Sequence, residues 1–136
     1  MATEAKGTVA QTLDQRRAAH AWRVVQAVKK LPSEQQREFG REARRLPARI
    51  VTSGLGQALL FLKAKGYAEP LRHALSTWIL AERDRRGPRP EEADALLSEI
   101  LRRDASFLRL ATAEALAYAQ WLARFADAEG LMDANA

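Results

Sequence analysis

Arginine and lysine residues are the side chains of this sequence whose spacing most clearly indicates a chemical task. One set recurs every seven residues, which places its members on one face of a helix: Arg16, Arg23 and Lys30. A second set recurs mostly at three- and four-residue intervals: Arg37, Arg41, Arg44, Arg45 and, if the helix survives Pro47, Arg49. Guanidinium groups bind phosphate through paired N–H donors, so we predict that these two basic faces bind a polyanion.

The same charges have a second interpretation, as solvated helix faces held by local ion pairs. Three glutamates stand three residues before three of the arginines: Glu34, Glu38 and Glu42 before Arg37, Arg41 and Arg45. Each surface pair at this spacing contributes a few tenths of a kcal/mol and lowers the local positive charge. Phosphate binding and surface pairing therefore both remain open on pattern alone.

Residues suited to catalysis or cofactor binding are scarce. The sequence has no cysteine and two histidines, His20 and His73, which stand far apart and outside any metal-ligand motif. Gly54 and Gly56 follow no strand and precede no Lys-Ser or Lys-Thr pair, so they do not form a phosphate loop. We predict a chain that is not an enzyme, with no catalytic residue, no metal and no cofactor.

Length and composition place these residues in one small domain. The chain has 136 residues, a formal charge of +5 and 47% hydrophobic residues, enough to fold around one core. Of the basic residues 17 are arginine and 5 are lysine, and the excess positive charge lies in the first 52 residues. No apolar run approaches the roughly 20 residues of a membrane span. We predict a single helical domain over residues 1–136, with flexible ends at 1–8 and 131–136, a cytoplasmic location and no membrane partner.

Helices must position the basic faces, because alanine and leucine dominate and no segment alternates apolar and polar residues. The fold class predicted is all-α, a bundle of about six helices. Their expected ranges are 9–31, 33–47, 50–65, 67–86, 90–103 and 105–129.

Local signals within these ranges give sharper expectations. Ser33 and Gln36 have the form of a capping box, and Pro47 is expected to interrupt the helix or begin a new one. At least one of Gly54 and Gly56 is expected to pack against a neighbouring helix, because glycine is otherwise costly there. The three tryptophans lie in or beside apolar stripes and are expected in the core: Trp22, Trp78 and Trp121.

Three segments resemble one known family. The first reads Leu-Pro-Ala-Arg-Ile at 46–50 and continues as Gly-Leu-Gly-Gln-Ala-Leu-Leu-Phe at 54–61. The second reads Trp-Leu-Ala-Arg-Phe at 121–125, and the third is the opening helix at 14–22. In this order and spacing they resemble the small α-helical subunit of the type III-B CRISPR effector, the Cmr complex. Ala123 departs from the basic residue expected before Arg124.

The resemblance implies a non-catalytic structural subunit of an RNA-guided RNA-interference complex. Its implied partners are guide and target RNA, the backbone and large subunits of the complex, and further copies of the same chain stacked along the RNA. The eight basic residues named above are then the predicted RNA-binding set. The alternative is a helical adaptor that binds only protein; a DNA-binding helix-turn-helix regulator fits the interleaved charges less well.

Overall fold

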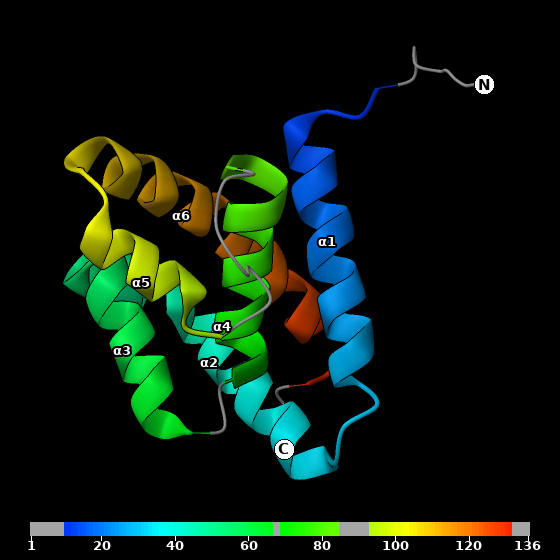
Figure 1. Cartoon of the computed structure of the whole chain (residues 1–136). Helices are drawn as coiled ribbons and strands as arrows, with labels where there is room; N and C mark the ends of the chain where they lie inside the picture. The colour runs from blue at the N-terminus through cyan, green and yellow to red at the C-terminus, as the bar shows by residue number, and fades with distance from the viewer. Residues whose placement is uncertain (1–9, 67–68, 85–92, 132–136) are drawn as a thin grey trace.

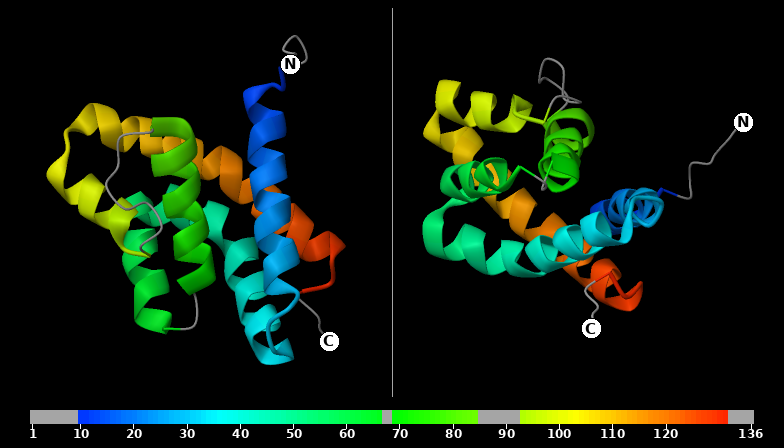
Figure 2. Two further views of the ribbon diagram at one scale, coloured as in Figure 1. Left: turned by 45° about the vertical axis from the view of Figure 1, so that its right-hand side comes forward. Right: turned by 90° about the horizontal axis from the view of Figure 1, so that it is seen from below.

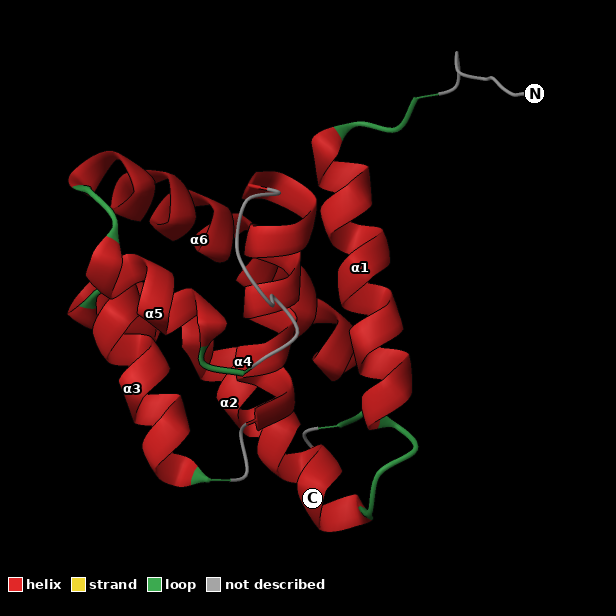
Figure 3. Ribbon diagram, viewed as in Figure 1, coloured by secondary structure: helices red, strands yellow, loops and turns green. Residues whose placement is uncertain are grey.

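The computed structural model describes residues 10–66, 69–84 and 93–131, and these residues form helices joined by short connections. Six α-helices are present in this part of the chain, and it contains no strand (Figures 1 and 3). The predicted all-α bundle of about six helices is therefore confirmed. In the described residues no helix is both long enough and apolar enough to cross a membrane.

The longest helix, α6, organises the bundle. It packs mainly against α2 and α1, while α3 packs against α2, α4 and α5 (Figure 2). Helix α4 continues directly into a π-helical segment, η1. The element bounds are α1 Leu13–Val28, α2 Ser33–Ser53, α3 Leu55–Lys65, α4 Glu69–Ser76, η1 Thr77–Asp84, α5 Ala95–Arg102 and α6 Ala105–Ala128.

One continuous apolar core joins these helices. Its largest fully buried side chains include Trp78 of η1, Tyr118 of α6 and Phe39 of α2. The rings of Trp78 and Tyr118 stack with their centroids 5.6 Å apart. Burial of such aromatic rings is a main contribution to the stability of a small domain, and it fixes how α4–η1 sits on α6.

Helix α1, Leu13–Val28, is shorter at both ends than the expected range 9–31. Thr12 is the N-cap: its hydroxyl accepts from the Gln15 backbone N–H at 3.0 Å, and the Gln15 side chain accepts from the Thr12 N–H at 2.7 Å. This reciprocal capping box satisfies two backbone donors that the helix leaves free, so it sets the start at Leu13.

The capping box predicted at Ser33 is wrong. Ser33 is the first helical residue of α2 and Pro32 occupies the cap position without a side-chain hydrogen bond. The Gln36 side chain donates instead to the carbonyl oxygens of Lys29 and Leu31, at 3.0 and 2.8 Å. It therefore ties the turn between α1 and α2 to the helix that follows.

The interruption predicted at Pro47 is also absent, because α2 runs through it to Ser53. A proline inside a helix removes one backbone hydrogen bond and crowds the preceding turn. Leu46 and Ile50, on either side of it, are buried in the core. Packing of this apolar side, chiefly against α6, holds the helix together across the proline.

Gly54 is the residue that separates α2 from α3. Its φ of 90° and ψ of 157° lie where side-chain-bearing residues are rarely found. Its N–H donates to the Ile50 carbonyl and its own carbonyl accepts from Ala58, so it ends one helix and begins the next. Gly56 faces α5, but a methyl group there would lie 3.9 Å from Ile100 Cγ2, an ordinary contact, so the packing does not require a glycine as expected.

We expect opposite effects from alanine at these two glycines. Gly56→Ala should raise stability by roughly 0.4 to 1 kcal/mol, because the site has room and alanine restricts the unfolded chain. Gly54→Ala should lower stability by roughly 1 to 3 kcal/mol, because its backbone conformation is strained for any L side chain. Urea unfolding of both variants measures this, and a shift of the same sign in both would contradict it.

Three further helix ends follow their local signals, whereas α5 begins at Ala95, later than the expected residue 90. Gly66 and Gly130 have positive φ beside the ends of α3 and α6, and the Asp104 side chain accepts from the Phe107 N–H to cap α6. Leu131 was expected in a flexible tail, but it is buried and its N–H donates to the Ala126 carbonyl. The other positions of the expected flexible ends, 1–8 and 132–136, lie outside the described residues.

Candidate nucleic-acid interface

The outward face of α2 carries the densest group of basic side chains that the sequence pointed to. Arg41, Arg44 and Arg45 line a shallow groove of about 520 Å³ together with Ala48, and Arg37 is exposed one turn earlier. Arg44 reaches across to α6, where its guanidinium lies 3.5 Å from the Asp127 carboxylate. Both partners of this pair are more than half exposed, so it is screened by solvent and readily exchanged for a phosphate. We call these four arginines the α2 basic face.

Glu42 does not belong to that surface. Its side chain is only 1% exposed, and one of its oxygens accepts from Arg49 at 3.0 Å. The expected surface pairing with Arg45 is therefore wrong at this position. Because α2 turns Glu42 toward the interior, its charge is compensated there and dilutes the α2 basic face less than the sequence pattern suggested.

Arg49 is held by two contacts at the edge of the core. Besides its bond to Glu42, its guanidinium lies over the ring of Phe61 in α3, 3.6 Å from the ring centroid. A guanidinium stacked on an aromatic ring and bonded to a buried carboxylate is far from free to reach a phosphate. Arg49 thus differs from Arg37, Arg44 and Arg45, whereas Arg41 also lies near Glu42, with its Nε 3.8 Å from Glu42 Oε2.

The basic residues of α1 open onto a different surface. Arg16 donates to the Glu82 carbonyl of η1 at 3.5 Å, and Lys30 is exposed at the end of the helix. Arg23 lines a groove of about 500 Å³ between α1 and α4–η1. Helices α1 and α2 each pack mainly against α6 and only slightly against one another. The two basic faces therefore do not merge into one patch by direct pairing of their helices.

Both histidines, which the sequence placed in no metal-ligand motif, line the groove between α1 and α4–η1. His20 Nδ1 lies 2.5 Å from the Tyr118 hydroxyl, and its ring packs against Trp78 and Tyr118. Burial lowers the pKa of His20 to about 4, and the nearby Arg23 charge acts in the same direction. His20 is therefore neutral near pH 7 and joins α1 to the core.

A cluster of ion pairs and hydrogen bonds holds α1 against α6. Glu114 of α6 accepts from Arg17 through both carboxylate oxygens, at 2.5 and 3.0 Å, and from the Trp78 indole at 2.7 Å. Arg17 also donates to Asp14 at 3.0 Å. Charge-assisted bonds of this kind orient α1, η1 and α6 together. In the described part of the chain no group of three metal-binding side chains comes together.

The tryptophans divide between core and surface. Trp78 is 1% exposed, as expected for the core, but Trp22 is 48% exposed and Trp121 is only partly buried. Trp121 and Arg124 line a further groove of about 400 Å³ on the outer side of α6. Sequence reasoning assigned neither residue to a site. Trp121 and Arg124 are three positions apart, which puts them on neighbouring turns of one helix face. This spacing was the one feature of the sequence that indicated a shared site.

Comparison with known proteins agrees with this architecture. Residues 13–129 match the family model described as CRISPR-associated protein (Cas_Cmr5). The crystal structure of a CRISPR-associated Cmr5 family protein from Thermus thermophilus superposes with a TM-score of 0.72 at 28% identity, covering 87% of this chain and 97% of that one. No curated protein sequence gives a significant match. The resemblance seen in the sequence is confirmed: this chain belongs to the CRISPR-associated Cmr5 family and is a subunit of the Cmr (type III-B) complex.

Proposed function

We propose that this chain is a non-catalytic structural subunit that stacks along the guide–target RNA of the effector complex and contacts it through basic helix faces. Its role is antiviral defence by RNA-guided interference in the cytoplasm. Its further partners are the backbone and large subunits and other copies of itself. The family assignment supports membership of the complex, and the basic faces support the contact with RNA.

The α2 basic face is the observation that carries this proposal. Four arginines project from one side of a helix whose only buried acid, Glu42, is turned inward. Arg37 and Arg45 are exposed and have no carboxylate partner in the described part of the chain. The guanidinium groups of Arg37 and Arg45 are therefore suited to bind the phosphates of a strand without reading its sequence. Arg41 and Arg44 lie beside them, near Glu42 and Asp127.

Arg23 of α1 and Lys30, which lies just after the end of α1, offer a second, separate contact. Both are exposed and neither has an acidic partner within residues 10–66, 69–84 and 93–131. Arg16 and Arg49 are each engaged with the protein, through Glu82 and through Glu42 and Phe61. We therefore expect the exposed members of the predicted set to contribute more to RNA binding than these two.

Removing two arginines of the α2 basic face should flatten the salt dependence of RNA binding. Each phosphate contact adds roughly 0.7 to the slope of log affinity against log salt on a single strand. The double variant Arg37→Gln/Arg45→Gln should therefore bind more weakly and lose about 1.4 from the slope if both contacts are made. Fluorescence anisotropy with a labelled single-stranded RNA at several salt concentrations measures both quantities.

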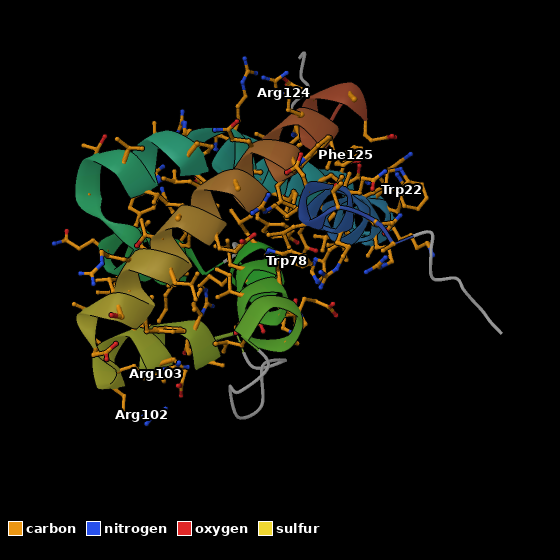
Figure 4. All side chains as sticks on the ribbon, turned by 90° about the horizontal axis from the view of Figure 1, so that it is seen from above. Trp22, Trp78, Arg102, Arg103, Arg124 and Phe125 are labelled. Atoms are coloured by element: carbon orange, nitrogen blue, oxygen red, sulfur yellow. The ribbon has the colours of Figure 1, made fainter. Side chains whose placement is uncertain are left out.

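The matched control removes the same charge elsewhere. Arg102 and Arg109 are exposed near the junction of α5 and α6, and Figure 4 places Arg102 at the end of the molecule away from Arg124. Arg102 pairs with the buried Glu99. When Arg102 is replaced, Glu99 still has a second cation, because Arg103 lies 3.6 Å away. The control variant Arg102→Gln/Arg109→Gln should change RNA affinity only slightly.

Two outcomes of this pair of variants would contradict the expectation. Equal losses of affinity in both would indicate non-specific attraction by net charge. No loss in Arg37→Gln/Arg45→Gln, with the fold intact, would favour the adaptor that contacts only protein. The exposed apolar side chains of Val51 and Leu101 are suited to that role.

A further inference from the structure

The groove on the outer side of α6 is not explained by phosphate binding alone. It lies between the beginning of α1 and the second half of α6, and its volume is about 400 Å³. Its lining consists of Asp14, Ala117, Gln120, Trp121 and Arg124. One flat aromatic ring, an amide, a carboxylate and a guanidinium thus converge in a space of the size that holds a small planar ligand.

The ring of Trp121 is held in place from two sides. Its indole N–H donates to Asp14 Oδ1 at 3.0 Å, and its ring stacks on Phe125 with centroids 5.8 Å apart and planes inclined by 28°. These contacts fix the plane of the indole while part of it stays exposed in the groove. A fixed, partly exposed aromatic ring is suited to stack a flat partner with little loss of side-chain freedom.

The polar groups of the groove surround that ring. Asp14 already accepts from Arg17, so its negative charge is largely compensated. The hydrogen bonds from Trp121 and from Arg17 lower the pKa of Asp14, which keeps the carboxylate ionised and available to accept. Gln120 and Arg124 are exposed, and Arg124 has no acidic partner in the described ranges. The groove therefore combines hydrogen-bond donors and acceptors with one uncompensated positive charge.

The groove lies on the same half of α6 as the residue that Arg44 of the α2 basic face contacts. Arg124 precedes Asp127 by one turn of α6, and Asp127 is the residue that Arg44 reaches from α2. Figure 4 places Arg124 and Phe125 together on this part of α6. A strand that lies on the α2 arginines would therefore pass Arg124 before it reaches Trp121.

We propose that this groove holds one unpaired base of an RNA strand whose phosphates lie on the α2 basic face. The base stacks on Trp121, its edge meets the Gln120 amide, and Arg124 binds the adjoining phosphate. This inference rests on the proposed function. A protein side chain fits less well, because Ala117 is the only aliphatic residue in the lining and the other members are polar or aromatic.

The test compares RNA oligomers with and without bases. Trp121→Leu keeps an apolar, smaller side chain at this position and removes the aromatic plane. It should weaken binding of single-stranded RNA by roughly 5- to 150-fold, and the salt slope should not change because no charge is lost. Binding of an abasic ribose-phosphate oligomer of equal length should be the same in wild type and variant. Arg124→Gln should lower the slope by about 0.7 for both oligomers.

Trp22→Leu is the matched control, because Trp22 is more exposed than Trp121 and does not line the groove. It should leave RNA affinity unchanged. If Trp121→Leu binds RNA like the wild type, or loses equal affinity for the abasic oligomer, the groove does not stack a base and this inference is overturned while the proposed function stands. If the wild-type chain binds no RNA, both fail. If Trp121→Leu impairs only assembly with other Cmr subunits, the groove is a protein contact and the base site is again overturned.

Discussion

Replacing Glu114 with alanine is expected to lower the free energy of unfolding by roughly 3 to 5 kcal/mol. The Glu114 side chain is only 3% exposed, and it neutralises Arg17, which is itself largely buried. Its loss leaves the Arg17 guanidinium and the Trp78 indole N–H without their buried acceptor. Because small domains are stable by only about 5 to 15 kcal/mol, the loss is a large fraction of the total. Urea unfolding followed by far-UV circular dichroism measures it.

The matched control is Glu129→Ala. Glu129 pairs with Lys29 at 2.7 Å between the same two helical regions, but the two side chains are 28% and 40% exposed to solvent. Its removal should cost less than about 1 kcal/mol. Glu114→Gln should fall between the two, because the amide can still accept from Trp78 but carries no charge. Equal losses for Glu114→Ala and Glu129→Ala would show that the buried cluster does not hold α1, η1 and α6 together.

Replacing Arg49 with alanine is expected to lower stability by roughly 2 to 4 kcal/mol, because it leaves Glu42 buried without its closest cation. The contact of the guanidinium with Phe61 is lost as well. Arg41 lies 3.8 Å from the other Glu42 oxygen and compensates in part. Arg45→Ala, on the exposed side of the same helix, should change stability by less than about 0.5 kcal/mol.

Arg49→Lys separates the two roles that an arginine at this position could have. A lysine keeps the charge but not the planar fork or the stacking surface, so stability should fall while RNA affinity is retained. Arg45→Ala should give the reverse result, with stability retained and RNA affinity reduced. If Arg49→Ala unfolds no more easily than Arg45→Ala but binds RNA more weakly, Arg49 is a phosphate contact and its pairing with Glu42 is dispensable.

The helical class and several helix ends could be predicted because they depend on neighbours along the chain. Gly66, Asp104 and Gly130 act within a single turn, through a positive φ or a capping carboxylate, and each lies where expected. The family could likewise be identified from three short segments, because they keep the order and spacing of the family pattern over most of the chain.

Where local signals in the sequence favoured a different helix start or a helix break, contacts with other parts of the chain determined the structure. Ser33 and Thr12 both precede a glutamine by three residues, yet only Thr12 caps a helix, because Gln36 finds the carbonyls of the α1–α2 turn instead. Pro47 is a strong local helix breaker, but burial of Leu46 and Ile50 in the core outweighs it. Such burial is worth more than the one backbone hydrogen bond that a proline removes.

The sequence by itself determined the number of basic side chains and the shared face of the arginines on α2, but not that of the first set, because Lys30 lies beyond the end of α1. Only the tertiary structure decided what each of them faces: Arg49 meets Glu42 and Phe61, Arg44 meets Asp127, and Arg17 meets Glu114. The same holds for Trp121, whose place beside Asp14 depends on a partner 107 positions away. Helical periodicity specifies in which direction a side chain points around its own helix axis. A binding site depends on the distances between side chains of different helices, and those distances are set by how the core packs.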